Sequence, residues 1–391
     1  MKTLLLPSSG ILAVAALSLT LAACKAPEDA KDLASNTSLG KISADRYGHT
    51  ATRLQDGRVI ITGGYVGLGI QSSEIFDPQT NQWTWGPQPV VASRLHANSL
   101  LLNDGRVLLV GGFKRSPEGG ELPAREIEVY DPVTNEFTVA ASMAKNRNGA
   151  TVTLLNDGRV LILGGSYFDY ENVRWVALDD GEIFNPVTNE IHTLPDRMSS
   201  TRTSHTAVLL PSGDVMVLGG MSVNGNPVEV IDVYRAHAEA FIQTNPLREA
   251  RYGHSSFLLS DESVLSIGGS YEISNFRMNA EIYYSGGSTT VWTTLPEASF
   301  GKNALQLQNS KIVFVSSFSN AAGQAIYALD QTTRLFSQVG NISVGRSGYT
   351  MTELEDGSLL IVGGTRMVDG YLHTCYDVER IYLSNTNETL E

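Results

Sequence analysis

Short apolar runs that end in two glycines recur along most of the chain. The runs RVIITGG, RVLLVGG and RVLILGG are examples. Such glycine pairs begin at Gly63, Gly111, Gly164, Gly219, Gly268 and Gly363. Ser316 and Ser317 stand where one more pair is expected, and the intervals are then 47 to 55 residues. Self-similarity at a nearly fixed interval indicates a repeat architecture, in which each unit is one supersecondary element.

Each repeat predicts four short strands. The first, as in HTATRL, leads to a turn, and four of the seven turns are Asp-Gly, a strong hairpin signal. The second is the apolar run before the glycines, the third contains an aromatic, and the fourth follows a Thr-Asn turn. The repeats begin near residues 46, 94, 147, 202, 251, 299 and 346. Four strands in every repeat predict an all-β protein of seven blades, in which neighbouring blades bury each other's faces.

The repeat resembles that of the kelch family. The shared features are a double glycine after an apolar strand, then an aromatic residue, then a tryptophan, at an interval of about 50 residues. The resemblance covers roughly residues 40–390 and implies a seven-bladed kelch-type β-propeller with four-stranded blades. Repeat six departs from the pattern, because it has lost the glycine pair and the turn glycine. A propeller hosts many functions, so the resemblance says little about activity.

The last repeat lacks a fourth strand of its own. Residues 37–43, TSLGKIS, precede the first repeat at the place where a fourth strand would lie. We therefore expect this N-terminal strand to complete blade seven and to close the ring.

An arginine and an acid recur in fixed register. The arginines are Arg46, Arg94, Arg147, Arg202, Arg251 and Arg346, and the acids, two residues before the third-strand aromatic, are Glu74, Glu128, Glu182, Asp232 and Glu281. Repeat six has Ser299 and Ala325 in these places, and repeat seven has Arg380 at the acid position. Because a lone buried charge is costly, the joint loss in repeat six favours structural ion pairs. A cationic ring for an anionic ligand is the alternative.

Length and charge exclude some classes of function. The chain has 391 residues, of which 42% are apolar and 18% charged, so it is neither a disordered polymer nor a polytopic membrane protein. Its net charge of −13 repels phosphate backbones, and we expect no nucleic-acid partner.

The N-terminal segment is typical of an export signal. Lys2 precedes an apolar stretch that ends in Leu21-Ala22-Ala23-Cys24, which resembles the lipobox of bacterial lipoproteins. This resemblance implies a signal peptide over residues 1–23, lipidation of Cys24 and a membrane anchor there. Residues 24–36 are then a tether before the propeller of residues 37–391. Lys25, in place of an aspartate, favours the outer membrane, on its periplasmic side or at the cell surface.

Candidate ligand-binding residues lie in the connections between the second and third strands, which vary most in length. Repeat three contributes Tyr167, Phe168, Asp169, Tyr170 and Trp175, and repeat seven contributes Tyr371 and His373. Exposed aromatics beside carboxylates suit stacking on a sugar or a protein hot spot. Packing of each connection on its own blade is the alternative.

No residue pattern predicts catalysis, a metal or a cofactor. His49, His205 and His254 share one register but belong to different repeats, and Cys375 is the one cysteine after Cys24. We therefore expect a non-catalytic binding or interaction module at a bacterial cell envelope, with a protein or glycan ligand. The alternatives are a glycan-processing enzyme resembling the sialic acid mutarotases and a copper enzyme resembling galactose oxidase. The Tyr-His dipeptide that the second alternative would use is absent from the sequence.

Overall fold

The computed structural model describes residues 35–65, 72–91, 94–116, 121–272, 275–284, 287–300, 303–317 and 323–384. The expected signal peptide, Cys24 and the tether as far as residue 34 lie outside these residues. The described part of the chain contains no helix long and apolar enough to cross a membrane.

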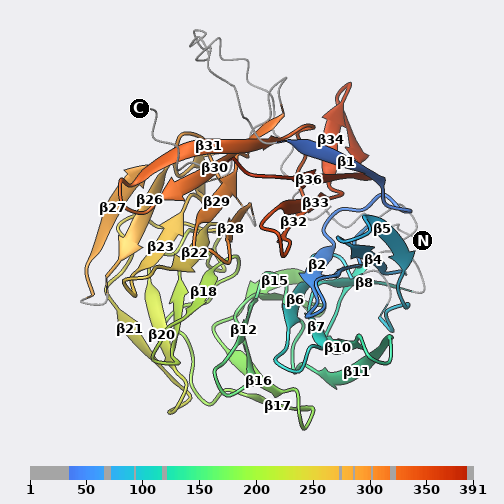
Figure 1. Cartoon of the computed structure of the whole chain (residues 1–391). Helices are drawn as coiled ribbons and strands as arrows, with labels where there is room; N and C mark the ends of the chain where they lie inside the picture. Colours follow the sequence, from blue (N-terminus) through green and yellow to red (C-terminus); the bar gives the residue numbers. More distant parts are fainter. Residues whose placement is uncertain are drawn as a thin grey trace.

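Seven four-stranded antiparallel sheets form a ring, and the strand that begins each blade faces its centre (Figure 1). Blade one consists of β2 (Thr50–Arg53), β3 (Val59–Thr62), β4 (Glu74–Asp77) and β5 (Gln82–Trp85). Blade two consists of β6 (Asn98–Leu101), β7 (Val107–Val110), β10 (Glu126–Asp131) and β11 (Glu136–Ser142). Blade three consists of β12 (Thr151–Leu154), β13 (Val160–Leu163), β16 (Gly181–Asn185) and β17 (Glu190–Thr193).

The other four blades repeat this order. Blade four consists of β18 (Thr206–Leu209), β19 (Val215–Leu218), β20 (Ile231–Arg235) and β21 (Ala240–Thr244). Blade five consists of β22 (Ser255–Leu258), β23 (Val264–Ile267), β26 (Asn279–Tyr283) and β27 (Thr289–Thr294). Blade six consists of β28 (Ala304–Gln306), β29 (Ile312–Val315), β30 (Gln324–Asp330) and β31 (Leu335–Ile342). Blade seven consists of β32 (Thr350–Glu353), β33 (Leu359–Val362), β36 (Asp377–Ile381) and β1 (Asn36–Lys41). The predicted seven-bladed all-β propeller is confirmed.

The hydrophobic core lies between the blades. All residues of the second strands are buried, because both faces of these strands meet a neighbouring sheet. One cluster joins Leu108 and Val110 of blade two to Val160 and Ile162 of blade three. Each such side chain contributes about 1.5–3 kcal/mol when fully buried, and no blade could bury both of its faces alone.

The N-terminal strand closes the ring. β1 pairs antiparallel with β36, with Asn36 opposite Ile381 and Lys41 opposite Asp377. Ile42, which follows the strand, is buried between blades seven and one with Val59 and Val362. The expected closure by residues 37–43 is therefore confirmed.

The glycine pairs let adjacent blades approach closely. Gly63 and Gly64 have φ angles of +72° and +95°. A Cβ on Gly63 would lie 2.3 Å from the carbonyl oxygen of Arg94 in the next blade, and that oxygen accepts the N–H of Gly64 at 2.9 Å. A side chain at either glycine would strain the backbone or push the blades apart.

The recurring arginines form buried ion pairs with the recurring acids. Arg94 Nε donates to Glu128 at 2.9 Å, Arg147 Nε to Glu182 at 3.0 Å, and equivalent pairs join Arg46 to Glu74, Arg202 to Asp232 and Arg251 to Glu281. Each arginine also donates to the carbonyl of the first glycine of its own blade. The acids accept backbone N–H groups of the segment before the arginine, as Glu128 does from Val91 at 2.9 Å. The paired groups therefore tie the segment before the first strand of a blade to the third strand of the same blade.

Repeat seven follows the same rule, so the placement of Arg380 at the acid position is wrong. Glu379 lies opposite Ile361, as Glu74 lies opposite Ile61, and it pairs with Arg346. The acid lies one residue earlier than Arg380 because this blade has no aromatic at the usual place in the third strand, and Tyr382 follows that place by one residue. The buried residue at that place is Ile381.

In repeat six the expected acid position, Ala325, is also wrong, by two residues. Tyr327, and not Ala325, lies opposite Phe314 at the place of the acid, and Leu329 is buried where the other blades have an aromatic. The Tyr327 hydroxyl donates to Glu297 at 3.1 Å. Gln324 donates to the carbonyl of Ser316 and accepts the N–H of Arg346, so an amide links blade six to the segment that begins blade seven.

Candidate functional site

In the part of the chain that the structure describes, one face of the ring carries four additional hairpins. They are β8 (Phe113–Arg115) with β9 (Glu121–Pro123), β14 (Ser166–Asp169) with β15 (Arg174–Ala177), β24 (Ser270–Glu272) with β25 (Asn275–Phe276), and β34 (Thr365–Val368) with β35 (Tyr371–Thr374). Each connects the second and third strands of its blade. Backbone bridges tie them to the segments before the first strands, as between Asn148 and Ser166 and between Tyr252 and Ser270. Both kinds of loop therefore lie on one face, which we call the hairpin face.

The hairpin of blade three holds a cluster of aromatic rings. The ring of Phe168 lies 5.0 Å from that of Tyr170 and 5.3 Å from that of Trp175, both in edge-to-face geometry. Trp175 also meets Phe113 of blade two at 5.8 Å. We call Phe113, Phe168, Tyr170 and Trp175 the aromatic cluster. Its rings stabilise one another, so the hairpin is held against the neighbouring blade.

Part of the aromatic cluster remains open to solvent. Tyr170 is 58% exposed and Trp175 is 41% exposed, whereas Phe168 is half-buried beneath them. Tyr167, on the other side of the strand, has the ammonium of Lys145 at 5.7 Å from its ring centroid. The predicted aromatic residues of repeat three therefore divide into two exposed rings and two rings that support the hairpin.

The carboxylates beside these rings are engaged in the fold. Asp169 accepts the N–H groups of Glu171 and Asn172 and the side-chain amide of Asn172 at 2.8 Å. These hydrogen bonds, the amide of Asn172 foremost, lower the pKa of Asp169. Its carboxylate therefore stabilises the turn of the hairpin.

Asp180, at the base of the same hairpin, is buried between two cations. It contacts Lys145 at 2.8 Å and Arg147 at 2.7 Å. Burial alone would raise the pKa of Asp180, but the charge of Arg147 and the hydrogen bonds from Lys145 and Arg147 lower it. The exposed surface of the blade-three hairpin is consequently more apolar than the sequence suggested.

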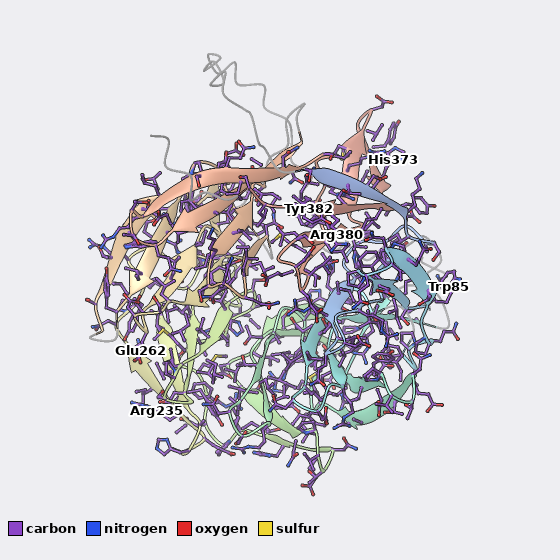
Figure 2. The ribbon with its side chains drawn as sticks, in the orientation of Figure 1. Trp85, Arg235, Glu262, His373, Arg380 and Tyr382 are labelled. Carbon is purple, nitrogen blue, oxygen red and sulfur yellow. The ribbon has the colours of Figure 1, made fainter. Side chains whose placement is uncertain are left out.

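Tyr371 and His373 lie on a different hairpin. Both belong to β35 of blade seven, both are exposed, and Tyr371 is 73% exposed. Figure 2 shows His373 on the hairpin of blade seven, which projects from the ring. The contacts of the described residues include none between these two side chains and the aromatic cluster. The seven candidate residues thus belong to two separate surfaces.

Phe113 was missing from the candidates. It belongs to blade two, and its contact with Trp175 depends on how two blades pack, which the spacing of one repeat does not reveal. A signal was present nonetheless. Phe113 directly follows the second glycine of its pair, and residues at this place pair with the loop before the first strand on the hairpin face.

The three histidines in common register link neighbouring blades. The Nε2 atoms of His49, His205 and His254 lie 3.0, 3.1 and 2.9 Å from threonine hydroxyls of the preceding blade. Burial foremost, together with the charge of a buried arginine beside each, lowers the pKa of His49 and of His205 to about 3. They are neutral at physiological pH and pack between blades, which is a structural role.

The described residues do not fit a copper centre. No group of three or more His, Cys, Asp or Glu side chains in the described ranges is arranged to hold a metal. The histidine Nε2 atoms contact hydroxyl groups, each between a different pair of blades. Cys375 is buried in blade seven, and burial raises the pKa of its thiol, so the reactive thiolate is disfavoured there.

Comparison with known proteins agrees with the fold. The family described as "Kelch motif" matches residues 98–144. The chain is a seven-bladed β-propeller with a kelch motif. The propeller is 29% identical over 167 residues to the kelch repeat-containing protein kel-10 of Caenorhabditis elegans, which is 42% of this chain and 27% of that protein. It is 28% identical over 248 residues to a galactose oxidase of Gibberella zeae, which is 57% of this chain and 35% of that enzyme.

A solved structure shares the architecture of the whole ring. A fungal alcohol oxidase of the AA5 family, in complex with copper, has a TM-score of 0.68 at 14% identity and covers 90% of this chain and 76% of its own. At this identity the likeness shows the fold alone. The propeller spans about a quarter to a third of the length of the curated relatives it matches, so their activities do not transfer with the fold.

Proposed function

We propose that the propeller is a non-catalytic binding module, anchored to the bacterial envelope through a lipid on Cys24. Its partner, a protein or a glycan, would bind on the hairpin face. The observation that carries the proposal is the aromatic cluster. Two large exposed rings, Tyr170 and Trp175, are held by ring contacts to Phe168 and to Phe113 of another blade. Rings fixed in advance lose little conformational entropy on binding, and Tyr and Trp are the residues most often found at hot spots.

The envelope location rests on the sequence of the N-terminus. An apolar stretch that ends in Leu21-Ala22-Ala23-Cys24 supports lipidation, and several acyl chains would give stable anchoring. Replacing Cys24 with Ala should move the protein from the detergent phase to the aqueous phase in a phase-partition assay. Equal partition of both forms would argue against the anchor.

The binding role is tested with Tyr170→Ala/Trp175→Ala in the full chain. The matched control is Trp85→Ala, because Trp85 is a 64% exposed tryptophan on the outer strand β5 (Figure 2). In-cell crosslinking followed by mass spectrometry should detect specific partners with the parent chain and with the control, but not with the double variant. If proteins are captured equally by all forms, and a glycan array gives no signal that depends on these two rings, the proposal fails.

The enzyme alternatives have less support among the described residues. The similarity to a galactose oxidase covers 57% of this chain, and His49, His205, His254 and Cys375 are buried within the blades. A glycan-processing enzyme like the sialic acid mutarotases would act in a pocket between the first strands of the blades, such as the one that Thr52, Ser99 and Met351 line. Loss of turnover on substitution of one residue of that pocket would favour it.

A further inference from the structure

The turns between the first and second strands of the blades lie on the face opposite the hairpins. In blade two, Arg106 follows the Asp-Gly turn, and its Nε donates to Asp104 at 2.8 Å while Nη2 donates to the carbonyl of Pro186 in blade three at 2.7 Å. In blade three, Arg159 bonds to Asp157 at 2.8 Å and to Glu239 of blade four at 2.9 Å. In blades two and three, a guanidinium therefore lies between the turn aspartate of its own blade and the next blade, in a gap that we call the slot.

In blade seven, the cation in the slot comes from a different strand. The blade has Ser358 in place of the turn arginine, but Arg380 of the third strand reaches the same position. Its guanidinium donates to Asp356 at 2.7 Å and to Asn81 of blade one at 2.9 Å. The repeated feature is thus a cation on the turn aspartate that also contacts the 3–4 turn of the next blade.

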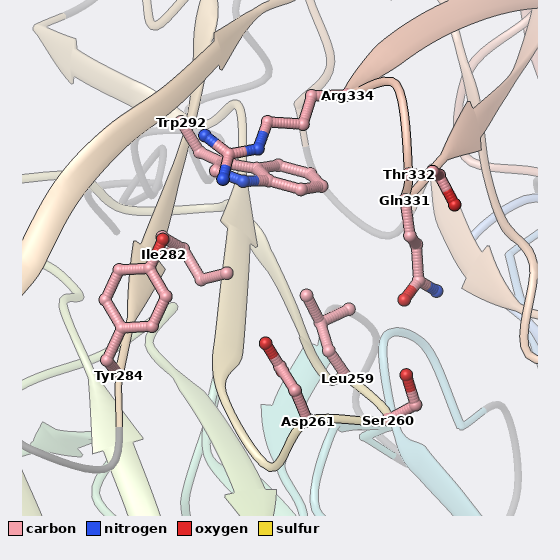
Figure 3. A pocket seen from close by; sticks show the side chains of 9 residues that line it. All are labelled: Leu259, Ser260, Asp261, Ile282, Tyr284, Trp292, Gln331, Thr332 and Arg334. Atoms are coloured by element: carbon pink, nitrogen blue, oxygen red, sulfur yellow. The ribbon is translucent and has the colours of Figure 1, made fainter.

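Blade five keeps the turn aspartate and lacks the cation. Ser263 stands where the arginine would be, and its N–H and hydroxyl both donate to Oδ1 of Asp261. Among the described residues, no hydrogen bond to Asp261 Oδ2 is found. A cavity of about 260 Å³ lies in this slot between blades five and six. Its walls include Asp261, Tyr284, Trp292, Gln331, Thr332 and Arg334 (Figure 3).

Arg334 enters the cavity from the opposite wall. It occupies the place in its turn that Asn81 and Glu239 have in theirs, with a φ of 63° like theirs of 55° and 48°. Its guanidinium lies 5.6 Å from the centroid of the Trp292 ring. Figure 3 shows Arg334 lying across Trp292 and the Asp261 side chain on the other side of the cavity. The cavity therefore has a carboxylate and a guanidinium facing it from opposite walls.

We propose that this cavity binds a free α-amino acid. The ammonium of the ligand would take the place of the missing guanidinium on Asp261, and its carboxylate would pair with Arg334. Leu259 and Ile282 would receive the side chain. The volume is below the roughly 300 Å³ of the smallest drug-sized sites and suits one small molecule. A sugar ring fits less well, because Arg334 covers the face of Trp292 on which it would stack. This site is on the other face and does not depend on the proposed function.

Titration calorimetry on the full chain tests the proposal. The probes are L-leucine, L-phenylalanine, L-glutamine and L-lysine, each with its N-acetyl and its amide derivative. We expect at least one free amino acid to bind, and both of its derivatives, which lack one charge, to bind at least about tenfold more weakly. Asp261→Asn keeps the Oδ1 acceptor of the turn and should weaken binding to the same extent, as should Arg334→Gln.

Ser263→Arg is the decisive third variant, because it restores the guanidinium of blades two and three. It should abolish binding while the thermal midpoint stays the same or rises. The control is Arg366→Gln on the hairpin face, which should bind as the parent chain does. The proposal is overturned if no free amino acid binds, or if binding is unaffected by Asp261→Asn and Arg334→Gln. A protein that fails to capture partners on the hairpin face but binds an amino acid would refute the proposed function alone.

Discussion

The Nε of Arg94 donates to Oε2 of Glu128 at 2.9 Å, and neither side chain is more than 1% exposed. Burial lowers the pKa of Arg94, while the charge of Glu128 opposes this. The other two nitrogens are also engaged, because Nη1 donates to the carbonyl of Gly111 and Nη2 to that of Glu126, each at 2.9 Å. Every nitrogen of the guanidinium and both oxygens of Glu128 thus have a partner inside the fold, and burial keeps these charges away from a dissolved ligand. The geometry therefore supports the structural interpretation of the arginine ring and disfavours an anion site there.

Arg94→Met should lower the free energy of unfolding by about 3–5 kcal/mol, because it leaves Glu128 buried without a counter-charge. Adding Glu128→Leu should recover part of that loss, since the pair is then replaced by apolar groups. The measurement is urea denaturation followed by tryptophan fluorescence. Arg197→Met is the control, because the pair of Arg197 and Asp179 is exposed and its loss should barely move the midpoint.

Removal of β1 should open the ring. A chain that begins at residue 43 loses the ladder with β36 and the buried side chain of Ile42, whereas one that begins at residue 35 keeps both. We expect the shorter chain to melt at least about 10 °C lower in calorimetry, since the loss of several kcal/mol shifts the midpoint of a large domain by that amount. Equal midpoints for the two chains would mean that the ring does not depend on its closing strand.

The repeated features of this fold could be predicted from the sequence, because each occurs in nearly every blade. The glycine pair, the Asp-Gly turn and the arginine are separated by fixed distances along the chain, so one blade supplies the register for the others. Prediction failed where a blade departs from its neighbours. In blades six and seven the third-strand aromatic is replaced by Leu329 and Ile381, which are buried at the same place but carry no aromatic ring to mark it in the sequence.

The candidate site was predicted less well, because its geometry depends on contacts between blades. The residues of the blade-three hairpin were identified, but their division into exposed rings and supporting rings was not. That division depends on Phe113 of the adjacent blade. The sequence also does not show that the Asp169 carboxylate accepts hydrogen bonds within its own turn, because the hydrogen bonds from Asn172 form only when the hairpin is folded.

Gly63→Ala should be far more harmful than a change at an open glycine. The new Cβ would lie 2.3 Å from the carbonyl oxygen of Arg94, which is backbone and cannot move aside. Gly225→Ala is the matched control, because its φ of +77° is equally unfavourable but nothing lies within 4 Å of the new Cβ. We expect Gly63→Ala to cost at least about 2 kcal/mol more than Gly225→Ala in urea denaturation. Equal costs would show that the φ angle alone, and not the close approach of the blades, requires glycine there.

The buried histidines should make the propeller sensitive to acid. The pKa of His205 is about 3 in the folded chain, against an ordinary value of 6.5, so the unfolded chain binds a proton that the folded chain does not between these two values. The contribution of neutral His205 to the free energy of unfolding is therefore fully present above about pH 6.5. It is lost as the pH falls toward 3, at up to about 1.4 kcal/mol per pH unit. His205→Gln keeps a side chain that can bond to Thr151. The free energy of unfolding of this variant should be lower than that of the parent chain at pH 7, but it should fall less steeply between pH 6.5 and 4. The exposed His373→Gln is the control and should follow the parent chain, while a parallel loss in all three would assign the acid sensitivity to the carboxylates.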